Sequence, residues 1–162
     1  MDNKATKIRT TVVYAKCSNC GFERKLYFTS DNSYGERVVS TKDGKLCAYA
    51  NLLIEKNSAE LFELSKEVLS DMNIEITETK LKRLTSSIYG IMCDEIENEV
   101  IDNTPNWKCS NCHNGKMEED KIFGEKLMEI EMPIVTHDKW NAMGQSEKKQ
   151  VILEELKQQS YI

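Results

Sequence analysis

The sequence predicts an α+β fold from three observations. Alternating apolar residues over 7–16 indicate a β-strand near the start of the chain. Apolar residues at helical spacing in the middle of the chain and at its C-terminal end indicate amphipathic helices. The pentapeptide Lys-Cys-Ser-Asn-Cys occurs twice, at 16–20 and 108–112, on either side of the central helices. We therefore expect split β-hairpins with a helical insertion and a short C-terminal helical pair.

The first third of the chain is expected to be extended. The strand over 7–16 is followed by a tight turn at 17–21 and by a returning strand over 22–29. Two valines at 38–39 indicate a further short strand, which ends at the Lys-Asp-Gly turn of residues 42–44.

Helices are expected in the middle of the chain. Residues 46–54 are apolar without a clear period, and we favour a helix for them. Ser58 can cap the following helix, which has an apolar face. Thr77 can cap the next helix, and Gly90 can end it. Residues 91–101 alternate imperfectly, which indicates a strand.

The C-terminal part is expected to begin with an extended segment. Residues 127–136 contain Pro133, which is incompatible with a helix interior. Thr136 can cap a short helix that ends at Gly144. Ser146 can cap a final helix with one apolar stripe.

Length and composition fit one compact domain with a small appendage. The chain has 162 residues, of which 40 % are apolar and 30 % charged, as in ordinary globular proteins. We assign residues 1–126 to a cysteine-bearing domain with a helical insertion at about 30–104, and residues 127–162 to a C-terminal strand and helical appendage. A chain of this length buries a real core, so a bound metal would be a local staple.

The sequence favours a cytoplasmic protein. Its polar start offers no signal peptide, and its longest apolar run, residues 46–54, is too short to span a bilayer. We therefore expect no membrane partner. Six cysteines in a cytoplasmic chain favour metal binding or free thiols over disulfides.

Four of the six cysteines form two Cys-x-x-Cys pairs. The two-residue spacing lets both sulfurs of a loop reach one metal ion, and Zn²⁺ prefers four such ligands in a tetrahedron. We expect one Zn²⁺ in a closed site, which has no open position for water and is therefore structural rather than catalytic. The expected ligands are Cys17, Cys20, Cys109 and Cys112. The expected counter-charges are Lys16, Arg24, Lys108 and Lys116.

These loops resemble those of zinc ribbons, a family in which two Cys-x-x-Cys knuckles hold one zinc ion. The resemblance covers residues 8–28 and 105–122. It rests on the four cysteines together with Gly21 and Gly115, since a glycine after each loop permits a left-handed backbone. The chain departs from the family in its spacer of 88 residues between the pairs, where about 15–20 are usual. We interpret residues 30–104 as a helical insertion between the halves of the ribbon.

Other chemistry stays open for the cysteines. One Cys-x-x-Cys pair can act as a dithiol redox pair, and iron can replace zinc in a Cys₄ site. Residues 109–113 also match the Cys-x-x-Cys-His signature of covalent haem attachment, which normally requires export. Two matched pairs favour a shared metal over each of these alternatives. Two separate metal sites would need further ligands, for which the chain offers His113, His137, Cys47 and Cys93.

Several single residues carry structural expectations. His137 is expected on a polar surface at a helix start. Trp107 is expected to cover the second cysteine loop, and Trp140 to pack the terminal helices. Cys47 and Cys93 are expected to be small buried side chains rather than reactive thiols.

The net charge of −5 is unevenly distributed. Residues 1–37 carry seven Lys/Arg and four Asp/Glu, a net of +3, whereas residues 55–103 carry twelve Asp/Glu and five Lys/Arg, a net of −7. An acidic surface can steer onto a basic partner. We therefore expect a non-enzymatic protein that acts by contact with another protein, such as a basic nucleic-acid enzyme. The candidate partner-binding residues are Asp94, Glu95, Glu97 and Glu99.

Small size, negative charge and a metal knuckle resemble phage-encoded inhibitors of the anti-CRISPR type. The resemblance implies an inhibitor of a host nucleic-acid enzyme, for example an RNA-guided nuclease with a basic channel. The alternative is a zinc-ribbon, nucleic-acid-binding transcriptional regulator that uses the basic N-terminal third, and the net negative charge disfavours it. No catalytic motif is recognised in the sequence, so we expect no enzyme activity.

Overall fold

The computed structural model describes residues 4–29, 35–122 and 124–162. These residues form antiparallel sheets and α-helices, which confirms the α+β class. None of the described helices is long and apolar enough to cross a membrane.

The chain forms two compact units, each of which is discontinuous in sequence. The first unit, called here the β-unit, consists of residues 1–53 and 95–135. The second, called here the helical unit, consists of residues 54–94 and 136–162. The chain therefore passes from one unit to the other three times.

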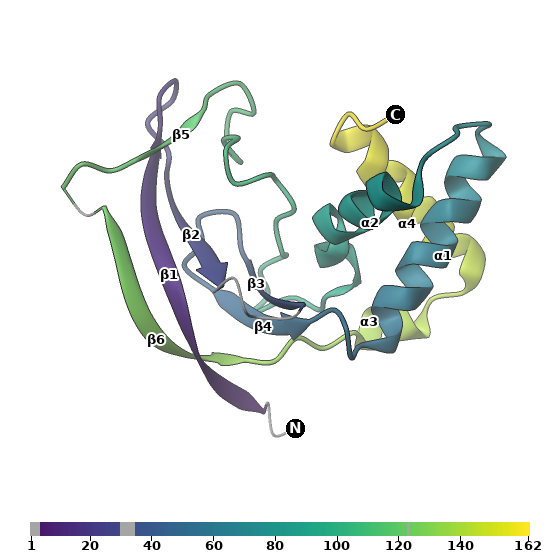
Figure 1. The fold of residues 1–162 in the computed structure, drawn as a ribbon, viewed down its shortest axis with the longest axis horizontal. Helices are drawn as coiled ribbons and strands as arrows, with labels where there is room; N and C mark the ends of the chain where they lie inside the picture. The colour runs from purple at the N-terminus through teal and green to yellow at the C-terminus, as the bar shows by residue number, and fades with distance from the viewer. Residues whose placement is uncertain (1–3, 30–34, 123) are drawn as a thin grey trace. The chain divides into compact units, whose positions relative to one another are not determined.

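The β-unit is built around one long strand, β1 (Ala5–Cys17). One side of β1 pairs with β2 (Glu23–Thr29), and the other side pairs with β6 (Glu125–Pro133) and the short β5 (Met117–Glu119), all antiparallel. Figure 1 shows β1 as a long curved strand with β2 and β6 beside it. The strands predicted for the N-terminal segments and for the segment around Pro133 are confirmed.

A second hairpin in the β-unit corrects one prediction. β3 (Glu36–Ser40) and β4 (Cys47–Asn51) pair antiparallel, so the helix expected over 46–54 is wrong. Ala48 and Ala50 are buried while the other three residues of β4 are half-buried, which is the period of two that a strand requires. β3 supplies the main-chain partner that makes this short apolar segment a strand.

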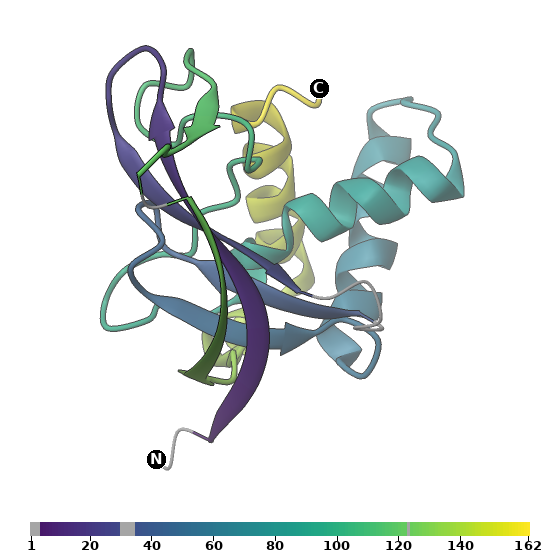
Figure 2. The same ribbon diagram turned by 60° about the vertical axis from the view of Figure 1, so that its left-hand side comes forward.

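The helical unit contains four α-helices and one short 3₁₀ helix. They are α1 (Lys56–Asp71), α2 (Glu78–Ser87), η1 (Tyr89–Met92), α3 (Asp138–Ala142) and α4 (Gln145–Gln158). α1 packs against both α2 and α4, and the residues that these helices bury are mainly apolar. Figure 2 shows α2 beside α1. Trp140 is 1 % exposed and packs in this unit, as expected. The main buried helix residues are Leu61, Leu64, Val68, Leu69, Leu81, Leu84, Ile152 and Leu156.

The helix starts follow the capping predictions only in part. Thr77 caps α2 as expected, because its hydroxyl oxygen accepts a main-chain hydrogen bond at 3.4 Å. Ser58 does not cap α1, which begins two residues earlier. Gly144 occupies the cap position of α4, so Ser146 lies inside the helix. The N–H of Gly144 donates to the side chain of Glu147 at 2.9 Å, so α4 has a cap at a position other than the predicted one.

Asp94 caps α3 from a distant segment of the helical unit. Its carboxylate accepts hydrogen bonds from the N–H groups of Asp138 and Lys139 at 2.8 and 2.9 Å, and from the Thr136 hydroxyl at 2.6 Å. Burial alone would raise the pKa of Asp94, but these hydrogen bonds outweigh it and lower the pKa. Thr136, the expected cap of this helix, instead donates to Asp94.

The strand expected over 91–101 is wrong. η1 occupies its start, and a tight turn follows in which Ile96 and Glu99 exchange main-chain hydrogen bonds at 2.9 Å. The two central residues, Glu97 and Asn98, have left-handed φ values of 50° and 67°. Such a turn reverses the chain within two residues, so no longer strand can form. We call residues 95–99 the acidic turn, because they include Glu95, Glu97 and Glu99.

His137 is buried, and the expected polar surface position is wrong. Its Nδ1 lies 2.9 Å from the carbonyl oxygen of Met92, and its Nε2 lies 3.1 Å from a carboxylate oxygen of Glu55. The Tyr89 hydroxyl donates to the same carboxylate oxygen. Both ring nitrogens therefore face acceptors, which favours the doubly protonated imidazolium. Burial lowers the pKa of His137, but the hydrogen bonds to Glu55 and Met92, together with the nearby carboxylate charges, outweigh it, and the pKa is raised overall.

This cluster predicts a pH dependence of the helical unit. A raised folded-state pKa means that His137 contributes stability that is fully present below its unfolded pKa of about 6.5 and is lost as the pH rises through the folded pKa. We expect the urea midpoint, followed by helical circular dichroism, to fall as the pH rises above about 6.5. The variant His137→Gln should lose this slope. A slope of the same size in the variant would contradict the assignment.

Candidate metal centre

The two Cys-x-x-Cys loops share one backbone form. Cys17 ends β1, and the N–H of Gly21 donates to its carbonyl oxygen at 3.1 Å. In the second loop the N–H of His113 donates to the carbonyl oxygen of Cys109 at 3.0 Å. Each loop is thus a tight turn that brings its second cysteine back toward the first.

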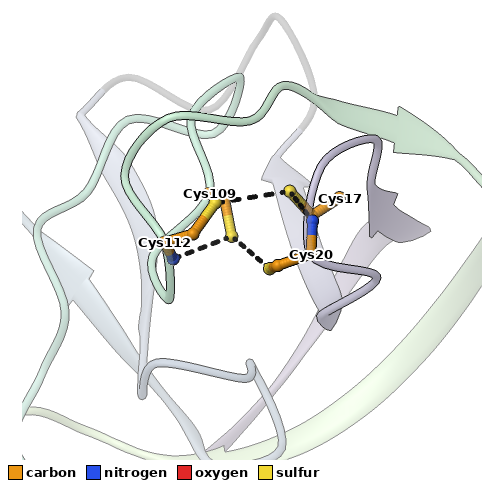
Figure 3. A group of neighbouring side chains, drawn as sticks. All are labelled: Cys17, Cys20, Cys109 and Cys112. Carbon is orange, nitrogen blue, oxygen red and sulfur yellow. Dashed lines mark hydrogen bonds between the residues drawn. The ribbon is translucent and has the colours of Figure 1, made fainter.

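The four cysteine sulfurs converge on one point (Figure 3). All four lie within 4.8 Å of one another. The sulfurs of Cys17 and Cys112 are 3.7 Å apart, as are those of Cys20 and Cys109. Four sulfurs at about 2.3 Å from a central ion form a tetrahedron with edges of about 3.8 Å. The four residues predicted as ligands are therefore positioned to bind one metal ion.

Main-chain N–H groups point at the first sulfur of each loop. Those of Asn19 and Cys20 donate to the sulfur of Cys17 at 3.3 and 3.5 Å. The equivalent groups of the second loop donate to the sulfur of Cys109 at the same two distances. Hydrogen bonds from N–H groups favour the negatively charged thiolate, which is the form that binds metal.

A second set of hydrogen bonds crosses between the loops. The side-chain amide of Asn19 donates to the sulfur of Cys112 at 3.6 Å, and that of Asn111 donates to the sulfur of Cys20 at 3.7 Å. The site therefore has an approximate two-fold symmetry. We did not expect a role for these asparagines, although their identical place before the second cysteine of each loop was a signal for one.

The surroundings favour thiolates at the second cysteine of each loop. The main-chain N–H of Asn114 is the largest of the influences that lower the pKa of Cys112 to about 6. The pKa of Cys20 is also lowered, chiefly by the main-chain N–H of Phe22. Burial instead raises the pKa of Cys109. A metal ion would therefore bind Cys20 and Cys112 as thiols that ionise readily, and it would displace the proton from the thiol of Cys109.

The two glycines of the loops act in different ways. Gly21 has a left-handed φ of 74°, as expected. Gly115 does not, but a Cβ at this position would lie 2.1 Å from the sulfur of Cys17, so only glycine permits the loops to approach this closely. His113 takes the left-handed position after the second loop, with φ of 58°. The expected role of Gly115 is therefore corrected from backbone freedom to close approach.

The positive charges at the loops differ in part from those expected. Arg24 is buried and forms an ion pair with Asp102 at 3.0 Å, so a carboxylate already balances its charge. Lys108 and Lys116 lie opposite each other in a β-bridge beside the second loop. Lys42, in the β3–β4 turn, was not expected, and its ammonium lies 3.0 Å from the side-chain oxygen of the second loop's asparagine. No local pattern links Lys42 to the cysteines, because the contact depends on tertiary structure.

Other residues with sequence-based expectations lie outside the cysteine cluster. Trp107 is 67 % exposed and does not cover the second loop, which corrects the prediction. Cys47 lies in β4 and Cys93 directly follows η1, and both are half-buried. Among the residues that the structure describes, the four clustered cysteines are the one group of three or more potential ligands whose donor atoms converge.

The four acids expected to bind a partner do not share one role. Asp94 holds the N-terminus of α3, as described above. Glu95, Glu97 and Glu99 are exposed on the acidic turn. Val100, which is 71 % exposed, follows directly. The structure therefore places three of the four carboxylates on an exposed surface and uses the fourth within the fold.

No protein-family model, no curated protein and no solved structure matches this chain. The likeness to zinc ribbons therefore rests on the four cysteines and the geometry of their two loops.

The glycine geometry gives a test of the site. Gly115→Ala should reduce metal binding, because the added Cβ would displace the sulfur of Cys17. His113→Gly should keep full metal content and change stability by no more than about 1 kcal/mol, since glycine relieves the left-handed strain while adding chain entropy. Metal content by elemental mass spectrometry and urea unfolding would measure both variants. Metal loss in His113→Gly, with full retention in Gly115→Ala, would contradict this geometry.

Proposed function

We propose that the four cysteines bind one structural Zn²⁺. The observation that carries this proposal is the pair of 3.7 Å sulfur contacts between loops that are 88 residues apart in sequence. Four thiolates this close would repel one another without a cation, and Zn²⁺ has a strong preference for four sulfur ligands in this arrangement. Iron accepts the same ligands, so the identity of the ion is a direct outcome of metal analysis.

The proposed zinc acts as a staple in the β-unit. It would tie the end of β1 to the segment that precedes β5. The four cysteines fill a tetrahedral coordination sphere, which leaves no position for water or substrate. We therefore propose that the ion is structural and that the protein works by binding rather than by catalysis.

We propose a basic protein as the binding partner. Support comes from the acidic turn, where Glu95, Glu97 and Glu99 are exposed and Val100 adds an apolar contact. Opposite charge would steer this turn onto a basic surface and fix its orientation there. The more specific form of the proposal is an inhibitor of the phage-encoded anti-CRISPR type, which would occupy the basic nucleic-acid channel of a host enzyme. Its support is the acidic turn together with the small size and the net charge of −5.

A nucleic-acid-binding regulator is the second candidate, and one observation favours it. Lys42, Lys108 and Lys116 lie at the cysteine loops, and Trp107 beside them is 67 % exposed. An exposed aromatic ring among lysines can stack on a base while the ammonium groups contact phosphates. The two candidates use different surfaces of the β-unit, so variants can separate them.

The zinc proposal predicts a stoichiometry. Protein purified without added metal should contain one zinc ion per chain by native and elemental mass spectrometry. Cys17→Ser and Cys112→Ser should each lose the ion and destabilise the β-unit, because metal-binding energy is folding energy at such a site. Cys47→Ala is the matched control and should keep it. Full zinc content in both serine variants would end the shared-site proposal.

The partner proposal predicts a charge dependence. Changing Glu95, Glu97 and Glu99 together to lysine should abolish capture of a basic nuclease or polymerase, and added salt should weaken capture by the unmodified protein. A control with the same change of charge reverses Glu125, Glu129 and Glu131 on β6, which should leave capture intact. Equal capture by both variants would sink the acidic-turn proposal. Retention of single-stranded DNA that is lost in Trp107→Ala with Lys108→Ala would favour the second candidate.

A further inference from the structure

The helical unit contains an apolar pocket that no function above uses. It has a volume of about 310 Å³ and lies where α1, α2 and the C-terminal residues of the unit meet. Leu69 of α1 and Leu84 of α2 are 2 % and 7 % exposed and form part of its wall. A largely preformed apolar pocket with a few polar groups at its rim is the usual form of a small-molecule site.

The turn between α1 and α2 supplies two of the residues that line this pocket. α1 ends in a Schellman motif, in which Asn73 has a left-handed φ of 56° and the N–H of Ile74 donates to the carbonyl oxygen of Leu69 at 2.9 Å. Ile74 is thereby folded back over the helix end, and Ile76 follows just before the Thr77 cap. Both isoleucines line the pocket and stay half-buried, so apolar surface remains for a ligand to cover.

Two cations on one face of α2 stand at the rim. Lys80 and Arg83 both line the pocket, are exposed, and are three residues apart, which places them as neighbours on the helix surface. Within the described part of the chain, neither forms an ion pair with a carboxylate. Lys82, between them in sequence, does not line the pocket and pairs with Glu78 at 2.7 Å. The pocket thus combines an apolar wall with positive charge on one side only.

We propose that this pocket binds an aliphatic carboxylate, with its chain against the isoleucine and leucine side chains and its carboxylate between Lys80 and Arg83. Burial of the chain would provide most of the affinity, since apolar area removed from water is the main favourable contribution. The two cations would select an anionic head group over a neutral or cationic one, because opposite charges at the rim attract it in an otherwise apolar site. This site is independent of the metal centre and of the acidic turn.

Head-group selection is the feature to test first. Sodium decanoate, decanol and decyltrimethylammonium carry the same chain with different head groups. Each would be titrated below its aggregation limit into full-length protein, and main-chain NMR shifts and calorimetry would be recorded. We expect saturable binding of decanoate, with shifts at Ile74, Ile76 and Leu84, an affinity about tenfold lower for decanol, and a lower affinity still for decyltrimethylammonium. Equal binding of decanol, or shifts elsewhere in the chain, would overturn the proposal.

Variants that remove positive charge from α2 test the two cations. Lys80→Ala with Arg83→Ala should weaken decanoate binding about tenfold, as expected for two exposed ion pairs. Lys82→Ala removes a positive charge from α2 at a position that does not line the pocket, so it should leave the affinity for decanoate unchanged. Ile76→Glu places a carboxylate at the wall and should abolish binding while circular dichroism shows an intact helical unit. Loss of affinity in Lys82→Ala equal to that in the double variant would overturn the rim assignment.

The oligomeric state gives a further check. The proposal expects the same native mass with and without decanoate. Concentration-dependent dimerisation that shifts Ile74 and Ile76 without ligand, and that decanoate does not compete with, would show that a second copy covers this face and would overturn the proposal.

Discussion

The approach of four sulfurs from two distant loops is the constraint around which the β-unit is arranged. Cys17 is the last residue of β1 and lies opposite Met117, the first residue of β5, in the antiparallel register. The main-chain N–H of Ser18 donates to the carbonyl oxygen of Lys116 at 3.0 Å and continues this pairing into the loop. A shift of one residue would turn each side chain to the opposite face of the sheet. Sheet register and metal geometry therefore determine each other.

The repeated pentapeptide is explained by the near two-fold symmetry of the site. Each position after the lysine is used in both loops: the cysteines form the cluster, the asparagines donate to a sulfur of the opposite loop, and the serines make contacts between segments. The Ser18 hydroxyl accepts from the N–H of Lys116 at 3.3 Å, and the Ser110 hydroxyl donates to the carbonyl oxygen of Lys42 at 2.9 Å. The backbone symmetry continues one residue past the loops, where Gly21 and His113 both have a left-handed φ, but the side chains there differ.

Local patterns in the sequence predicted those features that depend on neighbours in the chain. The alternation of β1, the Thr77 cap and the spacing of each cysteine pair are of this kind. Two of the wrong predictions concern residues for which a distant segment decides the outcome. Residues 46–54 became a strand because β3 pairs with them, and His137 is buried because Glu55, 82 positions earlier, offers it a carboxylate.

The close approach of Gly115 to Cys17 could not be predicted from the sequence for the same reason. Its need for glycine comes from the sulfur of Cys17, which reaches it only in the folded chain. Lys42 likewise meets the second loop through a turn of the β3–β4 hairpin. The sequence predicted the four cysteines as candidate ligands, but it did not predict the groups that surround them.

The discontinuity of both units has a consequence for biosynthesis. The chain leaves the β-unit after residue 53, returns at residue 95 and leaves again after residue 135. At about 5–20 residues per second, the 88 residues between the cysteine pairs take about 4–18 s to be translated. During that interval the first Cys-x-x-Cys loop has only its own two thiols with which to bind a metal ion. In the same way, α1 is synthesised well before α4, the helix against which it packs. The β-unit therefore cannot close before β6 has left the ribosome, and the helical unit cannot close before α4 has followed it.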